Sequence, residues 1–329
     1  MDVERNMKVS INQSRLILPV VLVVVLAVFP IIGTPPAWLL YLFHFFIYLA
    51  MANMWNLLAG YSGLTFLGPA ALVGLAGYTL VIVTWNDLPF YLGIIVGGVV
   101  AAAFAALIAI PTFRMRGIYF AIGTLVVPEV LRNVFYVWKP IPGDFIGGGA
   151  GYMIKGIEGL SLTEFYWLAL VTGIVSILVM RLVLRSKLGL GLAAIRDSDR
   201  AAASSGVDVF RLKLYAFVIA AFIIGAAGAI FYISKGSIKP EKDAFDIGWL
   251  MYPLLATVIG GMRTEEGPIV GTTIVVFLYF LLSRYGQLSL LIQGAILVAV
   301  MLLVPEGIVG FVRRKTKNYQ SILQLATRR

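Results

Sequence analysis

Two ionisable side chains one helical turn apart stand out in this sequence, because they fall inside an apolar run. Glu129 and Arg132 lie near the middle of residues 118–138, where a helix would place them on one face and let them pair. If the run crosses a membrane, placing charged groups in lipid costs free energy, so these residues indicate a functional role. That role would be part of a translocation path or a conformational gate. The alternative is a polar clamp between helices. The one histidine, His44, is interpreted as a packing residue.

The usual equipment of an enzyme is missing from the sequence. There is no cysteine, which excludes disulfides, thiolate metal sites and cysteine nucleophiles. A single histidine leaves little room for a metal site or a catalytic triad. No G-x-x-x-x-G-K-[ST], G-x-S-x-G or H-E-x-x-H motif occurs, so the common phosphate-binding, hydrolase and metalloprotease signatures are absent. We therefore expect no enzymatic activity, no metal and no cofactor in this chain.

The elements that position these residues are expected to be transmembrane helices. Of the 329 residues, 60% are hydrophobic and 13% are charged, and the mean hydropathy is +0.94; soluble domains carry about 25% charged residues. A helix needs roughly 20 apolar residues to cross a bilayer. The predicted fold class is therefore an all-α polytopic membrane protein with about ten transmembrane helices. The ten apolar runs are 16–33, 37–59, 64–84, 90–110, 118–138, 162–184, 212–233, 248–262, 267–283 and 288–304.

The distribution of basic residues orients these helices. Lys and Arg concentrate in the N-terminus, the turn at Arg114, residues 181–213 and the tail from Arg313, and an even number of runs separates each cluster from the next. On this arrangement both termini are cytoplasmic, with 19 Lys and Arg on the cytoplasmic side and 7 on the other, as the positive-inside rule requires. The net charge of +10 therefore indicates orientation, and no nucleic-acid partner is expected.

This topology divides the chain into three parts. The predicted domains are a cytoplasmic N-terminal segment 1–15, a transmembrane domain 16–311 and a basic cytoplasmic tail 312–329. On the side opposite the termini, the Gly-rich residues 139–161 are expected to be irregular or re-entrant, and residues 234–247 form a charged connection. Ser161 followed by Glu164 predicts a capping box at the start of the sixth helix.

Small residues recur in two separate parts of the chain. Residues 60–78 and 260–271 are rich in glycine, and each contains a Gly-Pro pair. Small residues let helix backbones approach closely, and paired Gly/Pro interruptions also mark midplane binding sites in transporters. Both interpretations, a translocation path and helix packing, stay open. The residues concerned are Gly60, Gly63, Gly68, Pro69, Gly74, Gly260, Gly261, Gly267 and Gly271.

The predicted cytoplasmic segment 185–213 carries helix signals of its own. Residues 197–199 (Asp-Ser-Asp) can cap a short helix over 200–205, and Gly206 suits the left-handed position that follows it. An isolated helix of this length is marginal in water, so we expect it to dock on this protein or on a partner. Its small Ala and Ser side chains suit insertion into a groove of another protein; a solvated connector is the alternative.

Several motifs resemble, in order along the chain, those of the LivM-type permeases of branched-chain amino acid importers. Residues 201–206 also resemble the EAA-type coupling loop of importer permeases, although Arg200 replaces the Glu that opens that motif, and Pro69 stands where the LivM family usually has His. The motifs are N-L-x-x-G-Y-x-G from Asn56, G-x-A-x-x-x-G from Gly68, R-G-x-Y-F-A-x-x-T-L from Arg116, E-x-x-R from Glu129, A-I-R-x-x-x-x-A-A-x-x-x-G from Ala194 and G-G-x-x-x-x-x-G-x-x-x-G from Gly260.

The resemblance implies the fold and the partners of a permease of an ATP-binding-cassette (ABC) importer. The partners would be a second permease subunit, usually a related LivH-type chain, two ATP-binding subunits and an extracytoplasmic substrate-binding protein, all at the bacterial cytoplasmic membrane and its lipid. Residues 185–211 would form the loop that couples this chain to the ATPase. The coupling residues would be Arg196, Asp199, Ala201, Ala202 and Gly206.

The resemblance also implies a cargo, which would pass through a path that this chain half encloses. Leucine, isoleucine and valine are the implied substrates, and permeases for urea, short amides or other amino acids are the alternatives. An ion-coupled secondary carrier is a further alternative. Such a carrier normally needs several buried ionisable groups, and Glu129 alone gives that alternative little support.

Overall fold

The computed structural model describes residues 21–115, 117–139, 141, 147–286, 288–304 and 306–326. Within that part the chain is almost entirely helical, and each of the ten predicted spans overlaps an apolar helix, although residues 16–20 of the first span lie outside the described residues. Six of these helices have the length and composition to cross a membrane, and four are shorter. The prediction of an all-α polytopic membrane protein is therefore confirmed.

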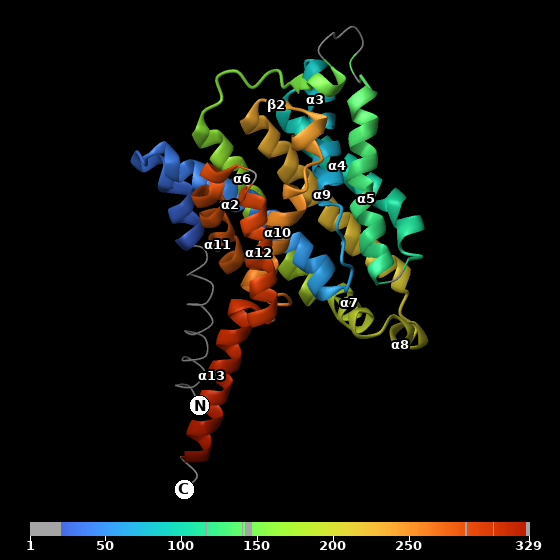
Figure 1. Ribbon diagram of the computed structural model, residues 1–329, viewed down its shortest axis with the longest axis vertical. Coiled ribbons are helices and arrows are strands. Elements are labelled where there is room, and N and C mark those ends of the chain that lie inside the picture. Colours follow the sequence, from blue (N-terminus) through green and yellow to red (C-terminus); the bar gives the residue numbers. More distant parts are fainter. Residues whose placement is uncertain are drawn as a thin grey trace, which may run out of the picture.

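The helices run up and down the bundle in chain order (Figure 1). They are an apolar helix over Val21–Ile32 that ends in the 3-10 turn η1 (Phe29–Ile32), then α2 (Pro36–Trp55), the π-helical turn η2 (Asn56–Tyr61), α3 (Pro69–Trp85), α4 (Phe90–Thr112), α5 (Ile118–Val137), η3 (Gly148–Ala150), α6 (Leu162–Arg185), α7 (Lys187–Asp197), α8 (Asp199–Ser204), α9 (Val209–Lys235), η4 (Pro240–Ala244), α10 (Gly248–Gly260), α11 (Gly267–Leu282), η5 (Ser283–Tyr285), α12 (Leu288–Leu303) and α13 (Gly307–Ala326). Two short strands, β1 (Tyr152–Met153) and β2 (Ser237–Ile238), complete the described fold.

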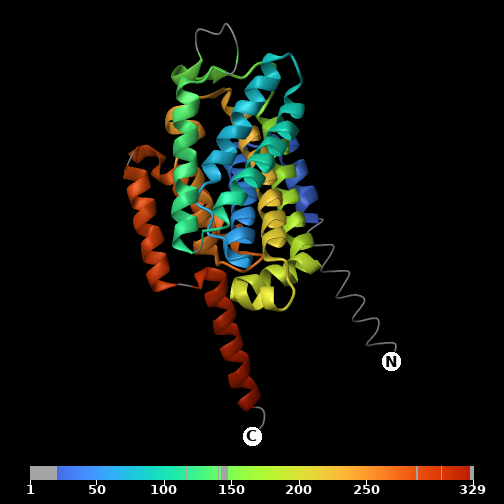
Figure 2. The same cartoon turned by 90° about the vertical axis from the view of Figure 1, so that its right-hand side faces the viewer.

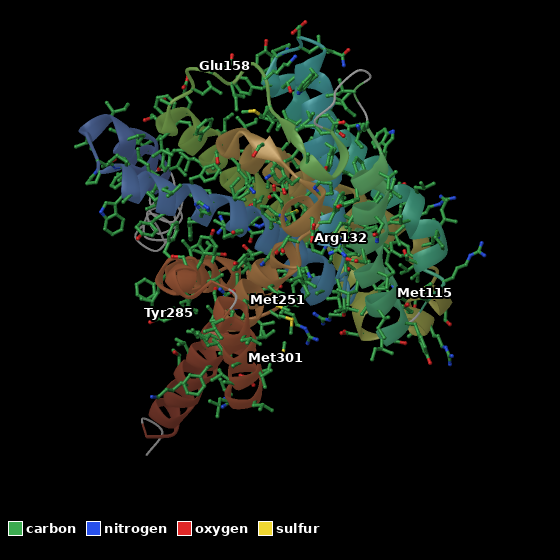
Figure 3. The ribbon with its side chains drawn as sticks, turned by 45° about the horizontal axis from the view of Figure 1, so that its top comes forward. Met115, Arg132, Glu158, Met251, Tyr285 and Met301 are labelled. Carbon is green, nitrogen blue, oxygen red and sulfur yellow. The ribbon has the colours of Figure 1, made fainter. Side chains whose placement is uncertain are left out.

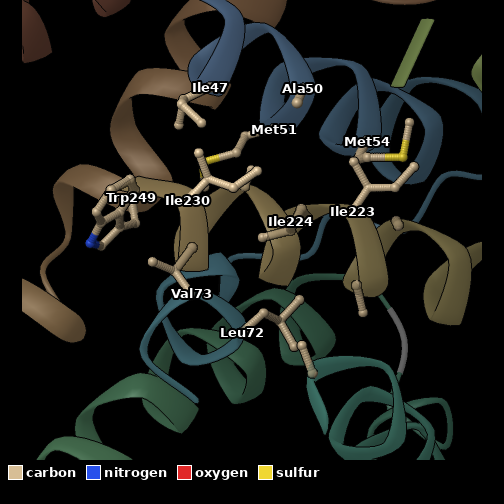
Figure 4. Packing of buried hydrophobic residues seen from close by; sticks show 14 of the residues in the cluster. Ile47, Ala50, Met51, Met54, Leu72, Val73, Ile223, Ile224, Ile230 and Trp249 are labelled. Carbon is tan, nitrogen blue, oxygen red and sulfur yellow. The ribbon is translucent and has the colours of Figure 1, made fainter. Parts of the chain in front are cut away.

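Helix α9 forms the centre of the bundle. It packs against α2, α3, α4 and α6, and most of its apolar stretch is buried. Figure 4 shows Ile224 and Ile230 of α9 between Met51 of α2 and Val73 of α3. Because lipid tails are as apolar as these side chains, close packing holds such helices together more than the hydrophobic effect does.

One end of the bundle is closed by the two strands. β1 pairs with β2 in antiparallel register, so that Tyr152 lies opposite Ile238. The indole of Trp85 donates a hydrogen bond of 2.8 Å to the Met153 carbonyl, which ties this ribbon to the end of α3. The segment 234–247, expected as a simple connection, is therefore joined to the segment 139–161. The capping box of Ser161 at the start of α6 is confirmed.

The opposite end gathers the described segments that the charge pattern assigns to the cytoplasm. Helices α7 and α8 lie across this end, and α13 projects beyond it (Figures 1 and 2). The connection after α10 meets α6 here through an ion pair of 3.0 Å between Glu265 and Arg181. The described segments that the span count assigns to one side of the membrane therefore lie at the same end of the bundle. The segment 1–15 lies outside the described residues, and the assignment of this end to the cytoplasm stays a prediction.

The structure corrects the start of the third span. Residues 64–84 were expected to be helical, but α3 begins only at Pro69. Gly63 has a φ of +72°, a conformation that ends the preceding helical turn, and proline favours the first position of the next helix. Residues 62–68 therefore form an irregular stretch. At the other end of the chain, α13 is a continuous helix across residue 312, where the basic tail was expected to begin.

Helices α10 and α11 are held together by direct backbone contact. A methyl group on Gly271 would overlap the carbonyl oxygen of Ala256, and one on Gly260 would overlap that of Gly267. Only glycine leaves room for this approach, which is the packing that small residues permit in membranes. The second glycine cluster of the sequence therefore closes a tight helical hairpin.

Replacing Gly271 with alanine should destabilise the protein by about 1–3 kcal/mol, the usual cost of overpacking a close contact. The matched control is Gly294→Ala in α12, where no atom lies within 4 Å of the added methyl group and where alanine is the better helix former. Thermal unfolding of the detergent-purified protein measures both. Equal melting temperatures for the two variants would show that the hairpin does not depend on this contact.

Candidate functional site

Asn56 clamps the irregular connection between α10 and α11 at the predicted cytoplasmic end. Its side-chain amide donates to the Thr264 carbonyl at 2.9 Å and accepts from the Arg263 amide at 3.0 Å. Asn56 is fully buried; its bond to Thr264 is buried and its bond to Arg263 is partly buried. Backbone groups between the end of α10 and the start of α11 have no hydrogen-bond partner within a helix. The Asn56 carboxamide supplies one donor and one acceptor to them.

The irregular segment 62–68 is held by α2 and by α5. The indole of Trp55 donates to the Phe66 carbonyl at 2.9 Å, and the Leu67 amide donates to the Thr124 hydroxyl of α5 at 3.1 Å. Pro128, one turn further along α5, has no amide hydrogen to give the Thr124 carbonyl. A Cβ on Gly68 would lie 2.6 Å from that carbonyl oxygen. Gly68 is therefore the residue that lets this segment approach α5.

Helix α7 rests directly on the same segment. Gly63 packs against the α carbon of Arg196, with 3.5 Å between that atom and the position of a Cβ on the glycine. Leu192 and Ile195 of α7 are buried beneath it. The Arg196 side chain pairs with Asp197 at 2.8 Å, and Arg196 keeps 23% of its side chain exposed. The predicted coupling segment is therefore seated on the membrane core.

Helix α8 has the caps that its sequence predicts. The Ser198 hydroxyl accepts from the Ala201 amide at 3.3 Å, and Gly206 takes the left-handed conformation at φ +83°. Ala202 is buried, while Ala201 and Gly206 are exposed. An ion pair of 2.7 Å between Asp199 and Lys213 ties the start of α8 to α9. The five predicted coupling residues thus lie together on α7, α8 and the turn that follows.

Glu129 and Arg132 form the expected ion pair, but on the surface of the chain. The pair lies within α5, halfway along a helix about 30 Å long, and 52% of Glu129 and 38% of Arg132 are exposed. Asn133 donates to the Glu129 carbonyl at 2.8 Å. Within the described residues neither charge bonds to a second helix, so this pair is not a clamp inside the chain. Figure 3 labels Arg132 on α5.

The other residues of the predicted path-or-packing set lie at close contacts. Gly74 faces the ring of Phe245, and Gly60 lies beside the Asn56 side chain. Pro69 is buried at the first turn of α3. Gly261, at φ +120°, packs on the turn before α13, with 3.1 Å between its Cβ position and the Glu306 carbonyl. None of these glycines is placed beside the Glu129 pair.

His44 is a packing residue, as predicted. It is buried, and its Nδ1 donates to the Leu40 carbonyl at 2.9 Å. Its ring stacks on Tyr279, and the edges of Phe231 and Phe280 surround it.

Sequence reasoning missed the buried polar bonds between helices. Asn53 of α2 donates to the Ser176 hydroxyl of α6 at 3.0 Å, and Thr257 of α10 donates to the Ala52 carbonyl of α2 at 3.1 Å. Asn56 is the third such residue. A signal was present, because uncharged polar residues inside apolar runs bond across helices in membranes. The partner of each could not be known without the packing.

The fold and this site define a class, a multi-pass helical membrane protein with two short helices, α7 and α8, across one end and an ion pair within the span α5. Residues 37–305 match the family described as the branched-chain amino acid transport system permease component. The chain belongs to this family.

Individual relatives agree with that family. The high-affinity branched-chain amino acid transport system permease protein LivM of Escherichia coli K12 is 28% identical over 82% of this chain and 69% of its own length. LivM of Salmonella typhimurium LT2 is 27% identical over the same shares. A probable LivH permease of Methanocaldococcus jannaschii is 25% identical over 61% of this chain and 66% of its own. No solved structure matches the chain.

Removing the clamp side chain with Asn56→Ala should lower the stability of the protein. The substitution leaves the buried Thr264 carbonyl and the partly buried Arg263 amide without their side-chain partner, and one buried unsatisfied group costs about 1–3 kcal/mol. The control is Asn86→Ala, because the exposed Asn86 amide bonds only to the Ile82 carbonyl of its own helix. Thermal unfolding in detergent compares them, and an unchanged midpoint for Asn56→Ala would contradict the clamp.

Proposed function

We propose that this chain is a permease subunit of an ABC importer and forms half of the translocation path for branched-chain amino acids across the bacterial cytoplasmic membrane. The family match over residues 37–305 supports the proposal, as do the names of the LivM and LivH relatives. ATP hydrolysis belongs to partner subunits. The further partners are a second permease, two ATP-binding subunits and an extracytoplasmic binding protein.

The observation that carries the proposal is the seat of α7 and α8 on the membrane core. An importer must transmit force from an ATPase to helices that enclose the path. Here the exposed surface of α8 carries small side chains, its buried Ala202 faces the protein, and α7 contacts η2 and α9. A push on α8 would therefore reach the segment 62–68 and, through Thr124, helix α5.

The exposed face of α5 supports a path between two permeases. A charge at the centre of a lone helix costs about 2.5–3.5 kcal/mol or more in lipid, so a surface that shows Glu129 and Arg132 is unsuited to face acyl chains. α5 is also among the least buried of the spans, and it stands at the edge of the bundle in Figure 1. We assign this face to the second permease and the aqueous path between the two subunits.

The substitution Gly206→Asp should abolish uptake and the retention of ATPase subunits. A side chain at φ +83° is strained, and the acidic group would also alter the surface offered to the ATPase. Gly156→Asp is the matched control, since Gly156 has φ +69° and likewise nothing within 4 Å of an added Cβ, but lies at the opposite end. Co-purification of the ATPase subunits and leucine uptake are measured. Full ATPase retention by the Gly206 variant would contradict the coupling role.

Thiol labelling tests the water-filled path beside α5. The chain has no native cysteine, so Val126→Cys on α5 and Val171→Cys on α6 each introduce a single thiol at similarly exposed positions of 51% and 58%. Because only the thiolate reacts and ionisation needs water, the α5 cysteine in the assembled importer should react at least about tenfold faster with a water-soluble methanethiosulfonate. Equal, slow reaction at both positions would place α5 in lipid.

A further inference from the structure

A cavity of about 440 Å³ lies beneath α8 at the predicted cytoplasmic end. Its walls come from the segment 62–65, the turn between α4 and α5, helices α7 and α8, and the start of α9. Cavities of about 300–1,000 Å³ hold small ligands. This one is formed by the same elements that join the coupling segment to the membrane core.

The charges in this cavity favour an anion. Arg196, Arg200 and Lys213 line it together with a single carboxylate, Asp199. Lys213 pairs with Asp199 and keeps only 14% of its side chain exposed, and Arg196 pairs with Asp197. Arg200 makes no ion pair or side-chain hydrogen bond among the described residues. An arginine with free donors can take a carboxylate through two parallel hydrogen bonds.

Apart from Ser62 and Thr65, the side chains on the rest of the described wall are uncharged and largely apolar. Phe113 and Phe120 from the two sides of the α4–α5 turn, together with Ile195 of α7, line the cavity. Phe120 and Ile195 are buried, so this wall belongs to the packed core and is preformed. A ligand with a carboxylate at one end and a branched aliphatic body at the other would match both parts of the cavity.

We propose that this cavity binds a small carboxylate with an apolar body, and that an occupied cavity slows transport. The branched-chain amino acids are the members of this class that the proposed function brings to the cytoplasm, so the choice of cargo as ligand rests on that function; their 2-oxo acids share the carboxylate and the branched body. A ligand that bridges Arg200 of α8 and Phe113 of the membrane core holds the coupling segment in one position. A ligand that binds more tightly to one position of α8 makes the other position less populated. Transport, which needs both positions, is then slower.

Binding to the full-length chain in detergent tests the site. The probe is radiolabelled leucine, with unlabelled 4-methyl-2-oxopentanoate and leucinamide as competitors. Leucine should bind saturably, the oxo acid should displace it, and leucinamide, which lacks the carboxylate, should not. The compound with the higher affinity, leucine or the oxo acid, identifies which of the two carboxylates the cavity binds. Arg200→Gln should weaken binding about tenfold or more, the value of a charge-assisted contact, and Arg185→Gln, an exposed arginine outside the cavity, should leave it unchanged.

A second variant tests the cavity itself. Ala203→Trp fills it from an exposed position of α8, so binding should be lost while the melting temperature is retained. In proteoliposomes that hold the whole importer, leucine loaded on the ATPase side should slow uptake, and Arg200→Gln should relieve that inhibition.

Two outcomes would overturn the proposal: binding that is the same in the wild type and in Arg200→Gln, or equal displacement by leucinamide. Failure of the proposed function would look different, because the importer would then not move leucine while Arg200-dependent binding persisted.

Discussion

The structure depends on the hydrogen bonds that the backbone amides and carbonyls make where the helices are interrupted. In hydrocarbon, backbone amides and carbonyls need partners inside the protein, and irregular segments survive only when they are buried in it. Two such interruptions are residues 62–68 and 261–266; the second lies against η2, just before the first, where the Arg263 amide nitrogen is 3.2 Å from the Cβ position of Gly60. Asn56 bonds to the Thr264 carbonyl and the Arg263 amide of the second interruption, and Trp55 bonds to the Phe66 carbonyl of the first. Two neighbouring polar side chains, Trp55 at the end of α2 and Asn56 at the start of η2, thus hold the junction.

Other elements of this end are built on the same junction. Arg181 of α6 and Arg313 of α13 pair with the adjacent residues Glu265 and Glu266 at the start of α11. The turn before α13 packs on Gly261, and α7 rests on Gly63 of the other interruption. Helices that are far apart in the sequence therefore meet at one place. A displacement of α7 has a packed route to α5, because residues 62–68 contact both.

The spans, their order and the caps of α8 could be predicted from the sequence, because hydropathy, charge and capping signals are local. The irregular stretch at residues 62–68 was less predictable, because a glycine and a proline such as Gly63 and Pro69 occur both at helix kinks and at helix ends. The partners of Asn53 and Asn56 could not be predicted, because they lie more than a hundred residues away. The Glu129 pair was predicted as a pair, but its exposure depends on which helices cover α5, and no local pattern encodes that.

The distribution of polar groups supports the proposal that the translocation path lies outside this bundle, between two subunits. Asn53, Asn56 and Thr257 point into the packed interior, and each bonds to another part of the same chain, so these residues are committed to holding helices together. The charges at membrane depth are instead displayed on α5, which few helices of this chain cover. A subunit that buries its uncharged polar residues and exposes an ion pair midway along a span is shaped to complete a polar surface with a neighbour. The proposed function gives a simple reason for the scarcity of other intramembrane charges, because a path shared by two chains would need only half of its lining from each.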